Sequence, residues 1–529
     1  MAKKRFYITT PIYYPSGNAH IGHAYCTTLC DVFARYKRMR HYECYFLTGT
    51  DEHGLKIEKK AKAEGVEPKE YVDTMVAKFR ELWKAMEISN DDFIRTTDER
   101  HIECVQNVFT HMLNNDDIYL SKYEGWYCFQ EESFWTDTQV GEDHLCPECH
   151  RPVQKATEET YFFKTQKYLS ELMKYYETPN LIYPENRKTE MINTFIKPGL
   201  SDLCVSRTSF SWGVPIRENN KHVAYVWLDA LFNYLSALGF GTSHDELYKK
   251  YWADEDSEII HVIGNDITRF HTIYWPEFLM SLGVRLPDRV FVHGLIMMKD
   301  GKMSKSRGNV VSPFPLIERY GVDALRYYLV RDIIFGQDGT FTPEQYIDRI
   351  NADLVNNLGN LLSRSVAMIV KYFDGVVPEF KSLCDKDRFL DSKVTLTIQN
   401  YENYLDDLHI SEAFSEVMSL LNDTNKYIDD MAPWTLAKDD KNKVQLEAVM
   451  SHLAYVLFVG GKLLEPVLVN KSKEIFKQLG LSEKECDYDN ILNNKILDNK
   501  KVFKGENLFP RLNVEEEVKY VASLMAQPK

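Results

Sequence analysis

The chain has 529 residues, of which 44% are hydrophobic and 27% are charged, as in ordinary globular proteins. Lys and Arg together number 64 and Asp and Glu 78, so the net charge is −14. This acidic balance excludes a protein that coats nucleic acid by bulk charge, although a local basic groove remains compatible with it. At roughly 150 residues per domain, the length predicts about three or four domains.

No targeting or membrane signal is evident. Basic residues 3–5 are followed directly by strand-like sequence rather than by an apolar signal segment. The most apolar stretch, residues 453–469, contains Lys462, Glu465 and Pro466, so we do not expect it to span a bilayer. Ten cysteines, mostly scattered singly, indicate reduced thiols. We therefore expect a cytoplasmic protein without membrane partners.

The first 115 residues alternate β-type runs with helical periodicity. Residues 6–10 and 45–48 are strand candidates, and residues 24–38 carry apolar side chains at helical spacing. This alternation is typical of parallel βαβ units in an α/β, Rossmann-like sheet. Residues 1–115 are therefore assigned to the first half of such a domain.

Residues 116–225 change to a turn-rich, aromatic pattern that contains the one cysteine cluster, so they are assigned to an inserted domain. The βα pattern then resumes. Its strand candidates are residues 223–227, 259–263 and 290–292. Residues 226–295 would complete the interrupted sheet.

The remaining chain consists of a segment that carries a lysine-rich loop and is assigned to stem contacts, 296–345, and an almost wholly helical region, 346–529. In the latter, apolar residues recur at spacings of three and four, which indicates one buried helix face. They are Leu354, Leu358, Leu361, Leu362, Val366 and Ile369. We expect an all-α domain here.

A first candidate for phosphate binding follows the first strand. Gly17 and Gly22 permit tight turns, and His20 and His23 lie three residues apart where a helix begins. The positive N-terminus of that helix and two imidazoles could receive an anion. Taken alone, a His-x-x-His pair is more often a pair of cap and packing residues.

A second candidate is the run of residues 299–309. Lys299, Lys302, Lys305 and Arg307 alternate with small residues and could close over a polyphosphate. As a bare charge cluster, the run would more often be a solvated surface loop. The two candidates together, at opposite ends of an interrupted βα domain, favour nucleotide chemistry.

His-Ile-Gly-His at residues 20–23 and Lys-Met-Ser-Lys-Ser at residues 302–306 resemble the two signatures of class I aminoacyl-tRNA synthetases. Further segments narrow the resemblance to methionyl-tRNA synthetases of the bacterial type. They are residues 8–15, 48–54, 193–200, 226–230 and 432–434. The similarity runs from about residue 5 to the end of the chain.

The resemblance implies that methionine is activated with ATP to methionyl-adenylate and then transferred to tRNA(Met). Charge accumulates on the α-phosphate oxygens in this reaction, so positioned donors are needed more than a nucleophile. His20 and His23 would stabilise the phosphates, and Lys302 and Lys305 would close over the pyrophosphate. Mg²⁺ would accompany ATP as a neutralising ion.

Two further residues are assigned to the ATP site. Gly22 lies within the first signature. Asp266 follows the strand candidate 259–263, at the edge of the sheet where ligands of open α/β sheets bind. We place Asp266 near the ribose or the amino acid.

The positions that match the family's amino-acid pocket are mostly aromatic or apolar, as the soft thioether of methionine requires. They are Ile12, Tyr14, Trp227, Ala230, Tyr234, His271 and Tyr274. Asp51 matches the carboxylate that holds the α-ammonium group. Without the resemblance, Trp227 and Tyr234 could equally be core residues. An apolar pocket discriminates a methylene group by only about 1–3 kcal/mol, so some activation of analogues such as homocysteine is expected.

The cysteine cluster departs from the family's pattern. Cys128, Cys146 and Cys149 remain, but Glu131 stands where zinc-binding relatives carry a fourth cysteine. Structural zinc sites are usually closed by four ligands, so Glu131, His144 or His150 would have to complete the set. A metal-free remnant of the knuckle is the alternative.

The helical region is expected to read the anticodon. Asn356, Asn360 and Arg364 recur every four residues, and Trp434 follows Pro433 at a helix start. In the family such residues stack on splayed bases and bond to their edges. A solvated polar helix face is the plainer interpretation.

The chain ends at Lys529, where many relatives continue into a tRNA-binding barrel that supports dimerisation, so we expect a monomer. A class I synthetase for another amino acid is one alternative function. The other is a non-catalytic paralogue that binds tRNA for regulation. The Trp227 and Tyr234 pocket opposes the first, and the intact histidine and lysine signatures oppose the second.

Overall fold

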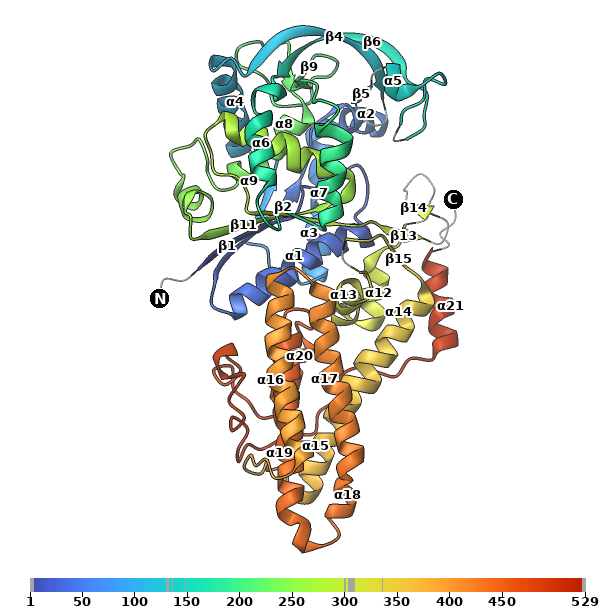
Figure 1. Ribbon diagram of the computed structural model, residues 1–529. Helices are drawn as coiled ribbons and strands as arrows, with labels where there is room; N and C mark the ends of the chain where they lie inside the picture. The colour runs from blue at the N-terminus through green and yellow to red at the C-terminus, as the bar shows by residue number, and fades with distance from the viewer. Residues whose placement is uncertain are drawn as a thin grey trace. The chain divides into compact units, whose positions relative to one another are not determined.

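The computed structural model of the chain is shown in Figure 1. It describes residues 4–129, 133–135, 137–147, 149–298, 301–302, 310–334 and 336–525. The chain forms two units, each with its own interior. The first comprises Met1–Ala19, Glu43–Glu81 and Ser89–His293. The second comprises His20–Tyr42, Leu82–Ile88 and Gly294–Lys529.

The first unit is built on a sheet in which every strand pairing is parallel. In spatial order its strands are β3 (Asp92–Arg95), β2 (Glu43–Thr50), β1 (Arg5–Thr9), β11 (Ser257–Gly264), β12 (Arg289–His293) and β7 (Ile182–Tyr183). Tyr7, Ile8, Ile259 and Ile260 are fully buried, as expected for parallel strands with both faces covered. The predicted Rossmann-like fold is confirmed.

The strand order reverses between β1 and β11. From β1 the chain continues to β2 and β3 on one side, and from β11 it continues to β12 on the other. Such a reversal opens a crevice at the carboxyl ends of the two central strands. The elements that follow the strands are α2 (Leu55–Glu64), α3 (Pro68–Ala85), α4 (Glu99–Asn114), η4 (Asn265–Ile267), η5 (Phe270–Tyr274) and α11 (Trp275–Ser281).

The inserted segment forms a second, antiparallel sheet. Its strands, in order, are β5 (Ser133–Trp135), β4 (Ile118–Cys128), β6 (Gln154–Phe163) and β8 (Leu203–Cys204). Strands β4 and β6 pair from Ile118↔Phe163 to Tyr127↔Gln154 and form the long curved ribbon of Figure 1. The segment also contains α5 (Asp137–Val140), η1 (Thr165–Lys167), α6 (Leu169–Tyr176), α7 (Glu185–Met191) and η2 (Ile192–Ile196). The insertion also contributes β7 to the edge of the parallel sheet.

One predicted strand is wrong. Residues 223–227 do not join the parallel sheet: only β10 (Val223–Ala224) is extended, and it pairs with β9 (Ser206–Arg207). A helix, α8 (Val226–Leu231), begins two residues later and is followed by α9 (Asn233–Ser236), α10 (Glu246–Tyr248) and η3 (Lys249–Ala253). The high β-propensity of Val, Tyr and Trp is overridden here by the packing of α8.

The second unit contains α1 (Ile21–Met39) and a long helical bundle. Its other elements begin with β13 (Ile296–Met298), β14 (Gly301–Lys302), α12 (Pro313–Tyr320), α13 (Val322–Arg331), β15 (Gly339–Thr340) and α14 (Pro343–Arg349). They continue with η6 (Ile350–Gly359), α15 (Asn360–Phe373), α16 (Asp385–Asp406), α17 (Ile410–Met431) and α18 (Pro433–Leu436). The last are η7 (Asp440–Asn442), α19 (Lys443–Leu464), α20 (Lys471–Gln478), η8 (Tyr488–Asn490) and α21 (Val514–Met525). Helices α16 and α17 lie side by side in Figure 1.

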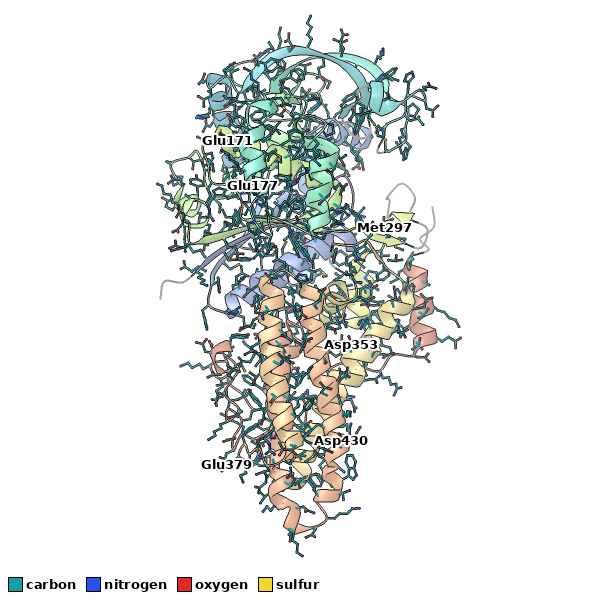
Figure 2. The ribbon with its side chains drawn as sticks, viewed as in Figure 1. Glu171, Glu177, Met297, Asp353, Glu379 and Asp430 are labelled. Carbon is teal, nitrogen blue, oxygen red and sulfur yellow. The ribbon has the colours of Figure 1, made fainter. Side chains whose placement is uncertain are left out.

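Two details refine the helical prediction. The stretch that carries Leu354 and Leu358 is a π-helix, η6, and becomes α-helical only at Asn360. Near its start Asp353, labelled in Figure 2, accepts hydrogen bonds from Tyr327 Oη (2.6 Å) and Arg349 Nη1 (3.0 Å). Among the described residues, Asp440–Leu464 is apolar and long enough to cross a membrane, but 83% of its apolar window is buried inside the fold. It therefore packs as a core helix.

An unpaired acid lies in the interior of the first unit. Glu277, on α11, is 0% exposed, and neither carboxylate oxygen has a hydrogen-bond partner among the residues that the structure describes. Burial, together with the nearby charge of Asp202, raises the pKa of Glu277 to about 9. Glu277 is therefore a neutral acid at pH 7.

Replacing this acid by its neutral isostere should stabilise the protein at alkaline pH. Folded Glu277 retains a proton that the unfolded chain releases near pH 4.5, so wild-type stability falls as pH rises from there to about 9. The slope is about 1.4 kcal/mol per pH unit. Glu277→Gln should remove it, so its advantage in unfolding temperature should grow from pH 6 to pH 9. An advantage that does not change with pH would contradict the prediction.

Candidate active site and nucleic-acid surface

A cavity of about 260 Å³ opens at the carboxyl ends of the central strands in the first unit. Most of its walls are apolar or aromatic. The lining residues are Pro11, Ile12, Tyr14, Asp51, Lys56, Val226, Trp227, Ala230, Leu231, Asn233, Tyr234, Ile267 and His271. A volume of this size and lining suits a small, partly apolar ligand rather than a nucleotide or a macromolecule.

Four parts of the chain supply these walls. Residues 11–14 follow β1, residues 51–56 follow β2, α8 and α9 carry residues 226–234, and η4 and η5 follow β11. The carboxyl ends of neighbouring parallel strands meet at one edge of a sheet. The cavity therefore exists only because β1 and β11 are adjacent.

One wall has a fixed hydrogen-bond polarity. Tyr234 Oη lies 2.7 Å from His271 Nε2, and His271 Nδ1 lies 3.0 Å from the carbonyl oxygen of Ile267. The carbonyl can only accept, so Nδ1 carries the imidazole hydrogen and Nε2 accepts from the Tyr234 hydroxyl. Burial lowers the pKa of His271 to about 4, so the ring is neutral at pH 7.

Another part of the lining carries a buried carboxylate. Asp51 is 7% exposed, and its backbone N–H donates to the carbonyl of Tyr13. The next residue, Glu52, is held by a bidentate pair with Arg95, at 2.7 and 2.8 Å. Two-point pairing of this kind is rigid, so it fixes the backbone that presents Asp51. The site thus pairs an anion with soft apolar walls.

Most of the predicted pocket residues meet at this cavity. Ile12, Tyr14, Asp51, Trp227, Ala230, Tyr234 and His271 all line it. Tyr274 was expected to form a wall but lies outside the lining, and its ring packs 5.7 Å from that of Phe270. Phe270 in turn stacks on Trp227 at 3.4 Å and supports it from behind.

The sequence pattern did not single out Lys56 or Asn233. Lys56 lies two residues after Gly54, whose φ of +107° turns the chain from β2 into α2. Asn233 is buried and donates to the carbonyl of Ala230 at 2.7 Å. For Lys56, the signal in the sequence was its position just after a glycine that turns the chain. No sequence pattern would have indicated Asn233 as a lining residue.

His20 and His23 lie at the start of α1 in the second unit. His20 Nδ1 accepts from the N–H of Gly22 (3.1 Å), and His23 Nδ1 accepts from the N–H of His20 (3.0 Å). Each neutral ring must then carry its hydrogen on Nε2. The histidines are helix caps, as the plainer interpretation expected, and they are also Nε2–H donors at the positive end of a helix.

Asp266 lies where its sequence position predicted, in η4 at the carboxyl end of β11. It is exposed and lies close over Gly264: a β-carbon at Gly264 would come within 2.7 Å of Asp266 Oδ1. Glycine at this position therefore allows the aspartate to approach the strand end.

The lysine signature is partly described. Strand β13, which contains Met297 (Figure 2), forms an antiparallel pair with β14 through Met297↔Lys302 and Met298↔Gly301. Lys299, Lys305 and Arg307 lie outside the described residues. The backbone of Lys302 thus belongs to a hairpin strand that leads into the signature.

The three cysteines of the inserted domain come together. The sulfur atoms of Cys128, Cys146 and Cys149 all lie within 4.8 Å of one another, and Cys128 Sγ and Cys149 Sγ are 3.5 Å apart. His144 stacks its ring on Trp126 at 4.0 Å, His150 is exposed, and Glu131 lies outside the described residues. Three sulfurs at this spacing suit a tetrahedral metal site that lacks one ligand.

The predicted anticodon residues lie on three helices of the second unit, η6, α15 and α18. Asn356 and Asn360 are exposed, and Trp434 on α18 is 45% exposed. Arg364 Nη2 lies 3.0 Å from Asp429 Oδ1. Asp429 is near the end of α17, five residues before Trp434 in the sequence. An exposed indole and a partly exposed guanidinium are each suited to stacking on an unpaired base.

The comparisons with known proteins agree with this geometry. The family model described as "tRNA synthetases class I (M)" matches residues 6–158 and 151–366. A second, "Anticodon binding domain of methionyl tRNA ligase", matches residues 377–527. A methionine–tRNA ligase of Bacillus subtilis is 52% identical over 98% of this chain and 80% of its own length. One of Listeria monocytogenes is 50% identical over 99% of this chain and 80% of its own length.

Solved structures give the same result. The methionyl-tRNA synthetase of Mycobacterium tuberculosis bound by methionyl-adenylate is 38% identical, with a TM-score of 0.91 over 96% of this chain and 100% of that chain. Its apo form is 35% identical, with a TM-score of 0.85 over 97% of this chain and 99% of that chain.

The interrupted parallel sheet, the His-x-x-His helix start and the helical bundle therefore define a class I aminoacyl-tRNA synthetase. Identity of about 50% across nearly the whole chain narrows the assignment further. The chain belongs to the methionyl-tRNA synthetase family, whose members are methionine–tRNA ligases.

Removing the charge of Asp51 should weaken methionine binding selectively. A charged hydrogen bond between a carboxylate and an ammonium group contributes roughly 1.5–3 kcal/mol, so Asp51→Asn should raise the KM for methionine about 10- to 100-fold. The KM for ATP should stay near the wild-type value. Methionine-dependent ATP–pyrophosphate exchange measures both. The exposed Asp256→Asn is the matched control, and an unchanged KM for methionine in Asp51→Asn would contradict the role.

Proposed function

We propose that the described side chains carry out the methionine–tRNA ligase reaction in two steps. Methionine first displaces pyrophosphate from ATP through attack of its carboxylate on the α-phosphorus, which gives methionyl-adenylate. The terminal adenosine of tRNA(Met) then takes the methionyl group and releases AMP. The observation that carries this proposal is the cavity beside β1 and β11, with one carboxylate among soft apolar walls.

We assign each group of methionine to a different part of the cavity. Asp51 would pair with the α-ammonium group, and Ile12, Trp227 and Ala230 would contact the thioether chain. The Tyr234 hydroxyl gives its hydrogen to His271, so it offers the ligand an oxygen lone pair rather than a donor. Discrimination against shorter or longer side chains then rests on shape, which is worth about 1–3 kcal/mol per methylene group.

The phosphates of ATP would meet fixed donors. The Nε2–H groups of His20 and His23 and the N-terminal dipole of α1 are already oriented before reaction, so stabilising the α-phosphate costs little reorganisation. We assign Gly22 and Asp266 to the same ATP site, and Lys302 and Lys305 to the departing pyrophosphate. Mg²⁺ would supply neutralising charge to the phosphates.

Anticodon recognition is assigned to the helical bundle. Asn356 and Asn360 offer amides that can bond to base edges, while Arg364 and Trp434 offer a cation and a stacking surface. This surface would let an acidic chain select one tRNA without general affinity for RNA, because contacts to bases rather than bulk charge set the specificity.

The deciding experiment is methionine-dependent ATP–pyrophosphate exchange. Lys305→Ala should lower the exchange rate about 100-fold or more, as removal of a transition-state donor does, and leave methionine affinity nearly unchanged. Lys473→Ala, at an exposed lysine of α20, is the control.

Three outcomes would contradict the proposal. If the wild-type chain catalyses exchange only with another amino acid, the methionine specificity is wrong. No exchange at all would favour a tRNA-binding paralogue, and a wild-type rate in Lys305→Ala would refute the role of the lysine loop.

We further propose that Cys128, Cys146 and Cys149 hold a structural Zn²⁺ ion. The donor set fits in part: three cysteine sulfurs converge, and burial raises the pKa of Cys149 to about 12, so this thiol is neutral in the metal-free protein. Bound zinc would take the thiolate form and fix the knuckle. Glu131, His144 or His150 would complete the set.

Elemental analysis tests the metal directly. The purified protein should contain one zinc ion per chain, and Cys146→Ser should lose it because two thiols and a single further ligand hold zinc poorly. Cys204→Ser, outside the cluster, should keep the ion. Wild-type protein without zinc would show that the knuckle is a metal-free remnant.

We also propose that the enzyme acts as a monomer in the cytoplasm, where tRNA is charged. The methionine cavity is lined by residues of four segments of this chain. Sedimentation equilibrium of the purified chain measures the oligomeric state.

A further inference from the structure

A network of buried hydrogen bonds lies next to the proposed methionine cavity. His53 Nδ1 lies 2.7 Å from Asp229 Oδ2, and Asp229 Oδ1 lies 2.8 Å from His101 Nε2. His101 Nδ1 then lies 2.8 Å from Ser236 Oγ. None of these four side chains is among the lining residues of the cavity, so none is positioned to touch the substrate.

The network nevertheless connects two of the four wall segments, residues 51–56 after β2 and residues 226–234 on α8 and α9. His53 is two residues from Asp51, and Asp229 lies on α8 between Trp227 and Ala230. Ser236 ends α9, which carries Tyr234, and its hydroxyl is 3.3 Å from the carbonyl of Asn233. Helix α4 contributes His101 and lies beside α9 (Figure 1).

The central carboxylate is unusually deep. Asp229 and His101 are 0% exposed and His53 is 5% exposed. Burial by itself raises the pKa of Asp229, but the two histidines outweigh it and hold the pKa at about 2, so the carboxylate is charged at pH 7.

A buried charge of this kind contributes little net stability, because desolvation offsets most of the attraction. Apolar side chains of similar volume would pack the same space. What the carboxylate adds is direction: its two oxygens hold two different elements at hydrogen-bond distance, with an angular preference that apolar contacts lack.

We propose that Asp229, together with His53 and His101, is a positioning unit that sets the distance between the ammonium-binding carboxylate Asp51 and the thioether-binding walls on α8 and α9. The proposal rests on the proposed methionine site. Its consequence is selective: loosening the unit impairs methionine binding and leaves the ATP site largely unaffected.

Substitutions at His53 separate positioning from mere filling of space. The amide of His53→Asn can place a donor close to the position of Nδ1 and keep the bond to Asp229, whereas His53→Ala cannot. We expect His53→Ala to raise the KM for methionine about tenfold, since misplacement of a binding group by a fraction of an ångström has effects of this size. The KM for ATP should change less than twofold, and His53→Asn should restore the KM for methionine to within about twofold of wild type.

Asp229→Asn provides a second variant with the same shape. Asparagine keeps one accepting oxygen but turns its amide hydrogens toward the other histidine, so one wall should lose its anchor. It should raise the KM for methionine and leave the KM for ATP unchanged. Both series are measured by pyrophosphate exchange on the full-length chain, with thermal unfolding recorded for each variant.

The outcomes are distinct. A rise in the KM for methionine alone, with rescue by His53→Asn, supports the positioning role. Parallel changes in both KM values that follow the loss of thermal stability, or wild-type KM values in His53→Ala and Asp229→Asn, would overturn it. Absence of methionine-dependent exchange in the wild-type chain would instead overturn the proposed function, and this inference with it.

Discussion

The pairing of β1 with β11 is the constraint on which the first unit depends. These strands are about 250 residues apart in the chain, yet they are hydrogen-bonded neighbours from Arg5↔Ser257 to Thr9↔His261. Closing so long a loop costs little more entropy than closing a shorter one, because the cost grows only with the logarithm of length. A whole inserted domain can therefore lie between the two strands, and their adjacent carboxyl ends create the crevice that becomes the cavity.

The second unit is organised around a buried ion pair. Asp31 of α1 and Arg326 of α13 are both fully buried, 2.6 Å apart. The same guanidinium donates to the carbonyls of Met86, Pro466 and Val467, so its hydrogens are used in the interior. Breaking such a pair would leave an uncompensated buried charge and cost about 3–5 kcal/mol. The pair therefore holds α1, which His20 caps, against the bundle.

Prediction from sequence succeeded where chemistry is local and periodic. The parallel sheet, the helical bundle and the helix that starts after His20 follow from hydrophobic spacing and capping. It failed where packing overrides propensity: residues 223–227 form the short strand β10 and the start of α8 rather than a central strand. It also did not distinguish the π-helix of residues 350–359 from an α-helix. The network of His53, Asp229, His101 and Ser236 left no trace in spacing, because its members come from four separate segments.

The sequence by itself determined the kind of chemistry. Its net charge of −14 argues against indiscriminate binding to nucleic acid. Its resemblance to the two class I signatures and to the family's aromatic amino-acid pocket indicates methionine activation. Only the tertiary structure decided which of those residues share a cavity and which ring nitrogen of His271 carries the hydrogen. It also showed that Tyr274 lies outside the cavity lining and that Lys56 lies within it. The physical reason is that residue types and their local spacing indicate secondary structure and the chemistry of a motif. Distances between segments far apart in the sequence are set by how the whole interior packs.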